Sequence, residues 1–431
     1  MDLFAVTGRP ILHSKSPSIY NACFRERSVS ARYSRLAADS AGEAMDLFLD
    51  IGLKGMNVTA PFKAEIIPCL QHLDAAAERI GSVNTIVREG TILKGYNTDY
   101  LGVSGALESR GIDPRGKPCL VLGAGGAGRA AVFALIQKGG LVTILNRNPE
   151  KARLAAETIG GAAGSLRDLD VHVGNARILV LTIPCDESIL KASHLSPGQV
   201  LLVADYKDTT YEPIAARKGL RHIRGEEWLK HQAIPALRLF LGDEGAGCNI
   251  DWPRVLQAAP PASRENIALI GFMGSGKSAV ARGVAARLDY DFVDIDDWIE
   301  KKAGKPIRDI FETDGEVHFR RMEKDALAEF APGKRSVLAC GGGAVLDEDN
   351  RRRLAENSLV IWIYTSMETA FSRMDISRRP LLRHPRPFFQ AQELFAQRRT
   401  HYFECADLVI GNEGPLEKTI GKIHEEIRLS L

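Results

Sequence analysis

The chain has 431 residues, a length that fits two or three compact domains better than one. Its 45% hydrophobic and 26% charged residues are typical of a folded globular protein and exclude a disordered chain. Lysine plus arginine (56) nearly balances aspartate plus glutamate (54), so we expect no nucleic-acid partner. No apolar run reaches the length of about 20 residues that a membrane helix needs, and the N-terminus lacks a signal-peptide pattern. We therefore expect a cytoplasmic protein with no membrane partner.

The first half of the chain carries a glycine-rich signature, GAGGAG, at residues 123–128. The apolar run 119–122 before it predicts a strand, the alanine-rich stretch 129–138 predicts a helix, and residues 141–145 predict a second strand. In this βαβ setting a glycine turn binds the pyrophosphate of a dinucleotide at the helix N-terminus. The predicted cofactor contacts in the turn are Gly123, Ala124, Gly125, Gly126, Ala127 and Gly128.

The residues after the second predicted strand indicate which dinucleotide binds. An acidic side chain at this place would bind the free ribose hydroxyl of NAD. This chain has Asn146 and Arg147 instead, with Lys151 one turn later. Because no carboxylate repels an additional phosphate and Arg147 can pair with one, we expect NADPH as cofactor, with all three side chains as contacts. The alternative for Arg147 and Lys151 is ordinary surface charge.

Several short motifs surround this region: HSKSP at 13–17, NVTAPFK at 57–63, GSVNT at 81–85, NTD at 97–99 and GEEWLKHQA at 225–233. Their order and approximate spacing resemble the substrate motifs of shikimate dehydrogenases. The resemblance implies a split α/β substrate domain and a Rossmann-like NADP domain. It also implies reduction of 3-dehydroshikimate to shikimate with NADPH.

The residue types in these motifs suit a polyhydroxy acid as substrate. Hydroxyl and backbone donors at Ser14 and Ser16 can hold a carboxylate on a turn. Thr59, Asn84 and Asp99 offer the mixed donors and acceptors that ring hydroxyls need.

The reduction also needs a proton for the developing alkoxide. By resemblance, Lys63 stabilises the alkoxide and relays this proton, and Asp99 orients Lys63 and binds the reacting hydroxyl. The resemblance also brings Gln232 to the substrate from a late helix.

Two segments depart from the family pattern. Residues 181–184, LTIP, replace an Asn-Ala-Thr-like segment that contacts the cofactor, so the contacts on the nicotinamide side stay open. The segment 205–213 is shortened, and either Tyr206 or Tyr211 can serve as the substrate tyrosine. We favour Tyr206.

A second phosphate-binding signature, GFMGSGKS at 271–278, forms a complete P-loop between an expected strand at 267–270 and an expected helix at 278–288. Backbone amides of such a loop cradle the phosphates of ATP, Lys277 neutralises the β and γ phosphates, and Ser278 binds Mg²⁺. The predicted nucleotide contacts are Gly274, Ser275, Gly276, Lys277, Ser278 and Ala279.

The remaining residues resemble shikimate kinases, which implies a P-loop NTPase-type kinase domain with a parallel sheet that phosphorylates shikimate. The features that carry this resemblance are FVDID at 292–296, GEVHFRR at 315–321, the glycine triplet at 341–343, RPLL at 379–382, and Arg398 four residues before Tyr402.

The resemblance also implies how the kinase residues work. Asp294 joins Ser278 around Mg²⁺, and Asp296 at the same strand end accepts from the substrate hydroxyls and acts as a base. Arg379 lies on a lid, contacts ATP and stabilises the transition state.

The substrate of the kinase half also has predicted contacts. Arg320 and Arg398 clamp the carboxylate of shikimate, and Gly342 brings bare backbone against the ring.

The segment AAPPASREN at 258–266 breaks both helix and strand and marks the boundary between the two halves. The predicted division is a dehydrogenase at 1–255 (substrate domain 1–102 plus 230–255, NADP domain 103–229), a linker at 256–264 and a kinase at 265–431.

The sequence as a whole predicts a bifunctional α/β enzyme of aromatic amino-acid (chorismate) biosynthesis. One alternative is a catabolic quinate or shikimate dehydrogenase fused to a kinase, which would favour NAD, and Arg147 argues against it. The other is a ligand sensor without catalysis, which would be expected to have lost groups such as Lys63 and Lys277. The sequence leaves open the oligomeric state, including a homo-oligomer, and channelling of shikimate.

Overall fold

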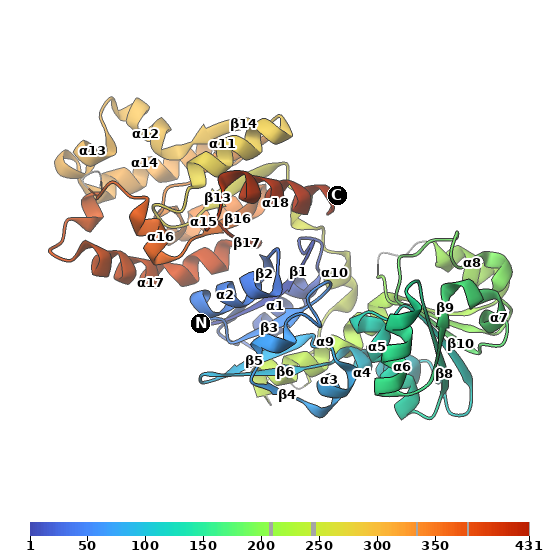
Figure 1. Cartoon of the computed structure of the whole chain (residues 1–431). Coiled ribbons are helices and arrows are strands. Elements are labelled where there is room, and N and C mark those ends of the chain that lie inside the picture. The colour runs from blue at the N-terminus through green and yellow to red at the C-terminus, as the bar shows by residue number, and fades with distance from the viewer. Residues whose placement is uncertain (207–209, 243–246, 333–334, 377–378, 431) are drawn as a thin grey trace. The chain divides into compact units, whose positions relative to one another are not determined.

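The computed structural model describes residues 1–206, 210–242, 247–332, 335–376 and 379–430, and every part of it is α/β (Figure 1). The chain packs as two compact units, and we describe each by itself. The first unit comprises Met1–Leu53 and Gln257–Leu431, and the second comprises Lys54–Leu256. Among the described residues, no helix combines the length and the apolar character needed to traverse a lipid bilayer.

A parallel sheet runs through the first unit in the order β14–β15–β13–β16–β17–β2–β1. Strands β13 and β16 are buried along their whole length, as expected for parallel strands that are covered on both faces. The strands are β1 Asp2–Gly8, β2 Ala31–Ala37, β13 Asn266–Ile270, β14 Asp291–Asp294, β15 Ser336–Ala339, β16 Ser358–Tyr364 and β17 Leu408–Gly411.

This sheet joins the beginning of the chain to its end. Strand β17 pairs in parallel with β2, so that Leu408 lies opposite Arg35 and Ile410 lies opposite Ala37. Each strand would otherwise leave a row of unpaired backbone groups at a sheet edge. The pairing removes both exposed edges at once.

The helices of the first unit pack on its sheet or on one another. They are α1 Ser16–Glu26, α2 Ala41–Ile51, α11 Lys277–Leu288, α12 Ile295–Ala303, α13 Ile307–Thr313, α14 Gly315–Phe330, α15 Glu348–Asn357, α16 Met367–Ser372, α17 Pro387–Cys405 and α18 Leu416–Arg428. The P-loop connects β13 to α11, so the strand and helix expected around it are confirmed to within one residue.

The second unit contains a parallel sheet in the order β12–β11–β10–β7–β8–β9. The strands run outward from β7 in one direction and from β10 in the other, which is the Rossmann order with its ligand crevice at the reversal. Helix α5, Gly126–Gln137, begins three residues earlier than predicted, inside the glycine-rich turn. The strands are β7 Pro118–Leu122, β8 Leu141–Asn146, β9 Ala162–Ser165, β10 Ile178–Leu181, β11 Val200–Val203 and β12 Arg221–Ile223, and the other helices are α6 Pro149–Ile159, α7 Leu169–Val173 and α8 Tyr211–Lys218.

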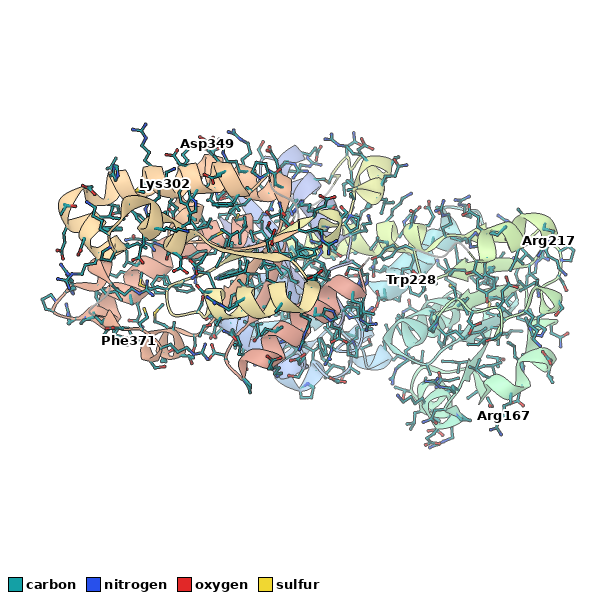
Figure 2. The ribbon with its side chains drawn as sticks, turned by 90° about the horizontal axis from the view of Figure 1, so that it is seen from above. Arg167, Arg217, Trp228, Lys302, Asp349 and Phe371 are labelled. Atoms are coloured by element: carbon teal, nitrogen blue, oxygen red, sulfur yellow. The ribbon has the colours of Figure 1, made fainter. Side chains whose placement is uncertain are left out.

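The rest of the second unit is a small sheet in the order β3–β5–β6–β4, covered by helices. Its elements are β3 Gly55–Val58, β4 His72–Leu73, β5 Thr85–Glu89, β6 Ile92–Tyr96, α3 Ala75–Ile80, α4 Asp99–Glu108 and α9 Gly225–Leu241. Helix α9 returns from the Rossmann sheet and packs closely on α4. Trp228 of α9, labelled in Figure 2, packs directly on Gly102 of α4, where a larger side chain would collide with its ring.

The compact units and the predicted domains divide the chain at different residues. The boundary between Leu256 and Gln257 lies at the start of the predicted linker 256–264. The other boundary, after Leu53, falls inside the predicted substrate domain, because β1, β2 and their helices pack with the C-terminal half. The division by function stays a prediction, since packing and function need not divide a chain at the same residue.

Candidate active sites

A polar cluster forms where β6 meets α4 in the second unit. The Lys63 Nζ atom lies 2.5 Å from Asp99 Oδ2, and the Asp99 side chain is only 3% exposed. Asn84 Nδ2 donates to Asp99 Oδ1 at 3.0 Å and to Gln232 Oε1 at 3.3 Å. Four residues from separate predicted motifs therefore share one network of hydrogen bonds.

The backbone around the cluster is held by two asparagines. The Thr98 backbone N–H donates to Asn84 Oδ1 at 2.7 Å, and the Asp99 N–H donates to Asn97 Oδ1 at 3.0 Å. These bonds fix the first residue of α4, so the Asp99 carboxylate is presented to Lys63 in a set direction. Thr59 follows β3 on the segment that leads to Lys63 and is half-buried.

The dinucleotide turn lies next to this cluster. A Cβ atom at Gly126 would lie 3.0 Å from Lys63 Cδ and 2.5 Å from Ser82 Oγ. Gly123 has a φ of +113°, and a side chain at Gly128 would collide with the Gly123 carbonyl. The turn therefore has the bare, tightly folded backbone that a pyrophosphate requires, within contact of the lysine.

The end of β8 carries the predicted determinants of cofactor choice. Asn146 Oδ1 accepts from the Ala124 N–H at 3.3 Å, which ties β8 to the glycine turn. Arg147 and Lys151 are both exposed. The side chains present fit a phosphorylated ribose, because two exposed cations follow the strand where NAD enzymes place a carboxylate.

Thr182 and Tyr211, from the two segments that departed from the family pattern, lie among the described residues, whereas 207–209 lie outside them. The Thr182 hydroxyl donates to the Leu122 carbonyl at 2.8 Å and packs against Gly123, so this residue supports the turn. Tyr211 is fully buried, with its hydroxyl 3.1 Å from the carbonyl oxygens of Asp186 and Leu190. Tyr211 is thus part of the Rossmann core, and Tyr206 stays our predicted substrate contact.

Ser14 and Ser16 lie in the first unit, at the start of α1. Ser14 Oγ accepts from the Ser16 N–H at 3.3 Å and lies 3.3 Å from Ser16 Oγ. Both residues are half-buried. Their role as carboxylate ligands stays a prediction.

The P-loop of the first unit has the backbone expected of a phosphate cradle. Gly274 and Gly276 have φ angles of +79° and +84°, and a side chain at Gly274 would collide with the Ala370 carbonyl. Lys277 Nζ donates to the Phe272 carbonyl at 2.9 Å and so folds back over the loop. Ser278 and Ala279 are exposed in the first turn of α11, and Ser275 is buried behind the loop.

Lys277 has an unusually low pKa for a lysine. Burial lowers its pKa to about 8, against the opposing effect of Asp296. The neutral amine that exists above this pH lacks the charge that pairs with phosphates.

We therefore expect the apparent affinity for MgATP to fall as the pH rises above about 8. The lysine should take up a proton on binding, because the phosphates favour its charged form. Titration calorimetry near that pH, in two buffers with different ionisation enthalpies, measures this uptake. Lys277→Met should abolish it, and equal heats in both buffers for the unaltered protein would contradict the prediction.

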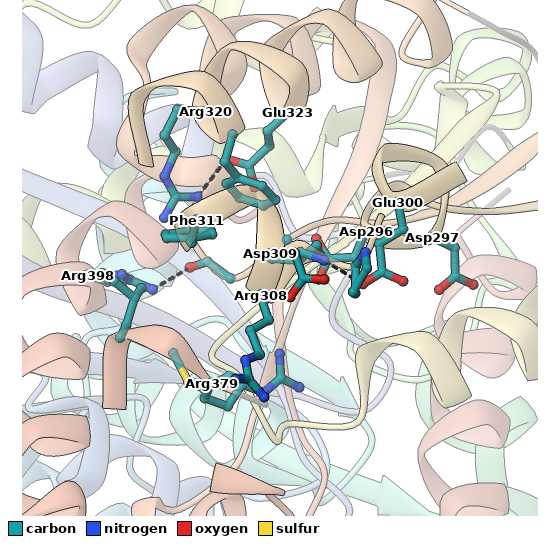
Figure 3. Close-up of a pocket in the computed structure, with 18 residues that line it drawn as sticks. Asp296, Asp297, Glu300, Arg308, Asp309, Phe311, Arg320, Glu323, Arg379 and Arg398 are labelled. Atoms are coloured by element: carbon teal, nitrogen blue, oxygen red, sulfur yellow. Dashed lines mark hydrogen bonds and ion pairs between the residues drawn. The ribbon is translucent and has the colours of Figure 1, made fainter. Parts of the chain in front are cut away.

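A cavity of about 600 Å³ opens beside the P-loop. In Figure 3, carboxylates including Asp296 face arginines across it, and Arg308 and Arg379 reach in from one side. Asp296 lies in the first turn of α12, which corrects the prediction that it lies at the strand end. Its Oδ1 atom is buried and has no hydrogen-bond partner among the described residues.

Glu323, which no sequence motif indicated, lies in the wall of this cavity. Arg320 NH1 donates to Glu323 Oε2 at 2.8 Å, while Glu323 Oε1 has no partner in the part of the chain that is described. Burial raises the pKa of Glu323 to about 7. A side chain at Gly341 would collide with Glu323 and lie 2.9 Å from Asp296 Oδ1. The i,i+3 spacing from Arg320 on one helix was the available signal.

The other predicted substrate contacts also line the cavity. Arg398 is 4% exposed and donates from NH1 to the Gly342 carbonyl at 3.3 Å. The Tyr402 hydroxyl donates to the same carbonyl. Arg320 and Arg398 therefore enter one cavity from different helices, α14 and α17.

Asp294 and Ser278 supply oxygen atoms, the donors that Mg²⁺ prefers. Asp294 ends β14, and its Oδ1 accepts from the Asp296 N–H at 3.0 Å, which leaves the carboxylate fixed at the head of α12. Among the described residues no group of three His, Cys, Asp or Glu side chains could by itself hold a metal ion. Mg²⁺ takes few protein ligands and completes its shell with waters and phosphates.

Comparison with known families identifies three regions of the chain. Residues 6–86 match the model for the shikimate dehydrogenase substrate-binding domain, and residues 107–203 match that for shikimate / quinate 5-dehydrogenase. Residues 273–428 match the shikimate kinase model.

Individual relatives agree with these matches. The NADP(+) shikimate dehydrogenase of Moorella thermoacetica is 38% identical over 61% of this chain and 94% of its own. Shikimate dehydrogenase from Aquifex aeolicus superposes with a TM-score of 0.54 and 32% identity, covering 60% of this chain and 98% of its own. Shikimate 5-dehydrogenase from Thermus thermophilus, solved with NADP(H) and shikimate, superposes with a TM-score of 0.51 and 31% identity. It covers 56% of this chain and 94% of its own. The chain therefore belongs to the shikimate dehydrogenase family and continues into a shikimate kinase domain, which makes it a bifunctional enzyme of the shikimate pathway.

Proposed function

We propose that this protein reduces 3-dehydroshikimate to shikimate with NADPH and then phosphorylates shikimate with ATP and Mg²⁺ to shikimate 3-phosphate. The observation that supports it most is the contact between two predicted sites, where Gly126 of the dinucleotide turn meets Lys63, itself paired with Asp99. The biosynthetic direction follows from the order of the chemistry, because the reduction creates the hydroxyl that the kinase then phosphorylates. Both cofactors belong to cytoplasmic pools, and we place the protein there.

In the dehydrogenase half, bound NADPH supplies the hydride. The Lys63 ammonium, 2.5 Å from Asp99, stabilises the developing alkoxide and delivers its proton to that oxygen. Asp99 accepts hydrogen bonds from Asn84 and from Lys63, which holds the lysine in place. The same polar network can bind a substrate hydroxyl. Gln232 extends the same network from α9. Ser14 and Ser16 are the predicted ligands of the substrate carboxylate.

In the kinase half, Arg320 and Arg398 hold the carboxylate of shikimate. The Asp296 Oδ1 atom, which has no hydrogen-bond partner in the described part of the chain, accepts the proton of the attacking hydroxyl. Lys277 and Arg379 stabilise charge on the transferring phosphoryl group. Burial and the neighbouring Asp294 raise the pKa of Asp296, which makes it a better base than an exposed aspartate.

A coupled assay of the purified protein tests the proposal. With 3-dehydroshikimate, NADPH, ATP and Mg²⁺, we expect NADPH to be consumed and shikimate 3-phosphate to form. With ATP omitted, shikimate should accumulate. Binding of both nucleotides without turnover of either would instead support a sensor.

Cofactor preference is a separate prediction. Arg147→Ala is expected to raise the KM for NADPH about tenfold, because an exposed charge-assisted hydrogen bond to the ribose phosphate is lost. The KM for NADH should stay the same, since NADH lacks this phosphate. Lys138→Ala, at the C-terminal end of α5 and paired with Glu108, is the control. An equal effect on both cofactors would contradict the assignment.

A further inference from the structure

The turn that carries Ser14 and Ser16 is held by the last helix of the chain. The backbone N–H groups of Ile11 and Leu12 both donate to Glu426 Oε2 at 2.8 Å, and the Ile11 N–H also reaches Oε1 at 3.1 Å. Glu426 belongs to α18 and is 2% exposed, and Ile11 and Leu12 are fully buried. A buried carboxylate from the kinase half thus satisfies two backbone donors at the start of the turn that leads to Ser14.

A second group holds the same turn at its other end. Arg35 of β2 donates to the Ser14 carbonyl from NH2 at 2.7 Å and from Nε at 3.2 Å. Its NH1 donates to the Asp407 carbonyl at 3.3 Å, at the residue before β17. Asp407 is itself anchored, because its carboxylate accepts from Arg264 at 2.5 Å and from the Val360 N–H at 3.0 Å. The Arg35 guanidinium therefore links the Ser14 backbone to the kinase sheet.

Charged side chains of opposite sign pair around these bonds. Lys422 of α18 is almost fully buried and pairs with Glu43 at 2.6 Å and with Asp39 at 3.2 Å. A buried lysine is costly unless it is paired, so this placement of α18 against the N-terminal segment is specific. The β17–β2 pairing and the bond from Ser34 Oγ to the Ala406 carbonyl at 2.9 Å extend the contact along the strand.

We infer that the kinase half supplies positioning residues for the dehydrogenase: Glu426, through the backbone of residues 11 and 12, and the Arg35–Asp407 link hold the Ser14–Ser16 turn in its substrate-binding conformation. The inference rests on the proposed role of the two serines as carboxylate ligands. Neither Glu426 nor Asp407 contacts the substrate in this account. Both act only by placing the turn, so their loss should weaken substrate binding more than it slows the chemical step.

The test compares two substitutions of Glu426 in the full-length protein. Glu426→Ala leaves two buried N–H groups without their acceptor and is expected to raise the KM for the keto acid substrate about tenfold. Its kcat and its KM for NADPH should change less than about twofold, because no group that meets the cofactor or the reacting oxygen is altered. Glu426→Gln keeps one side-chain oxygen, which can accept from both N–H groups, and should restore most of the affinity.

Arg35→Lys tests the other end of the turn. It keeps the charge but loses the fork that reaches Ser14 and Asp407 together, and we expect the same selective rise in KM. This variant keeps the buried carboxylate of Glu426, so it remains informative if Glu426→Ala does not fold. Ile420→Ala is the matched control, since Ile420 lies on the same helix but packs on Gly283 of α11.

The outcomes separate the inference from the proposed function. If Ser14→Ala raises the KM while Glu426→Ala and Arg35→Lys leave it unchanged, the inference is wrong and the dehydrogenase assignment stands. If Ile420→Ala raises the KM as much as Glu426→Ala does, general destabilisation of α18 explains the effect, and the inference is again wrong. If the unaltered protein does not reduce 3-dehydroshikimate at all, the proposed function itself fails.

Discussion

Replacing Lys63 by alanine is expected to slow the reductase turnover about a thousandfold, while shikimate phosphorylation continues at its normal rate. The reason is the position of the ammonium, 2.5 Å from a nearly buried Asp99, on a side chain in contact with the dinucleotide turn at Gly126. In the proposed mechanism the lysine both stabilises a developing negative charge and donates a proton, and alanine does neither. Steady-state NADPH oxidation, with the kinase reaction followed in the same preparation, measures the effect.

Lys94→Ala is the matched control for Lys63. Lys94 lies on β6 of the same sheet, but it is partly exposed and pairs with the exposed Glu89. Its removal should leave both activities unchanged, since surface ion pairs contribute little. If Lys63→Ala keeps more than about a tenth of the reductase turnover rate, the lysine is not the proton donor, and the source of the proton must be sought elsewhere.

Local sequence predicted the phosphate-binding parts of the structure well. Both glycine-rich turns, with their strands and helices, follow from backbone conformations that only glycine adopts easily, such as φ of +113° at Gly123. The motifs at 57–63, 81–85 and 97–99 could be joined into one site because a family resemblance already gave their order. The hydrogen bonds among Lys63, Asn84 and Asp99 agree with that grouping.

Contacts between segments far apart in the sequence could not be predicted. Nothing in β2 or β17 alone says that these two strands pair, because any short strand offers the same backbone groups. In the sequence, nothing distinguishes Glu426 from the other charged residues of an amphipathic helix. In the structure it is buried against Ile11 and Leu12. Glu323 was missed for a similar reason, since its burial depends on the absence of a side chain at Gly341.

Replacing Lys277 by alanine is expected to reduce shikimate phosphorylation by about a thousandfold and to leave the dehydrogenase unaffected. Lys277 lies over the P-loop, with its ammonium on the Phe272 carbonyl, where it is ready to exchange this neutral acceptor for phosphate oxygens. Alanine removes the charge but leaves the glycine backbone of the loop intact. We therefore expect nucleotide binding to weaken and the kinase turnover rate to fall further, as measured by formation of shikimate 3-phosphate.

Stability distinguishes a catalytic loss from a folding defect in this variant. Burial lowers the pKa of Lys277 to about 8 from an ordinary value of 10.5, so the folded protein holds this charge less readily than the unfolded chain does. The charged lysine thus destabilises the empty fold below about pH 8, and this cost declines as the pH rises from about 8 towards 10.5. Lys277→Ala should therefore keep or raise the Tm at about pH 7 although it strongly reduces the kinase activity. Lys302→Ala, which removes an exposed lysine from the face of Trp298, should change neither activity. A fall in Tm with Lys277→Ala would show that the lysine supports the fold. It would contradict the assignment of Lys277 as a group that destabilises the empty fold and serves to bind the phosphates of ATP.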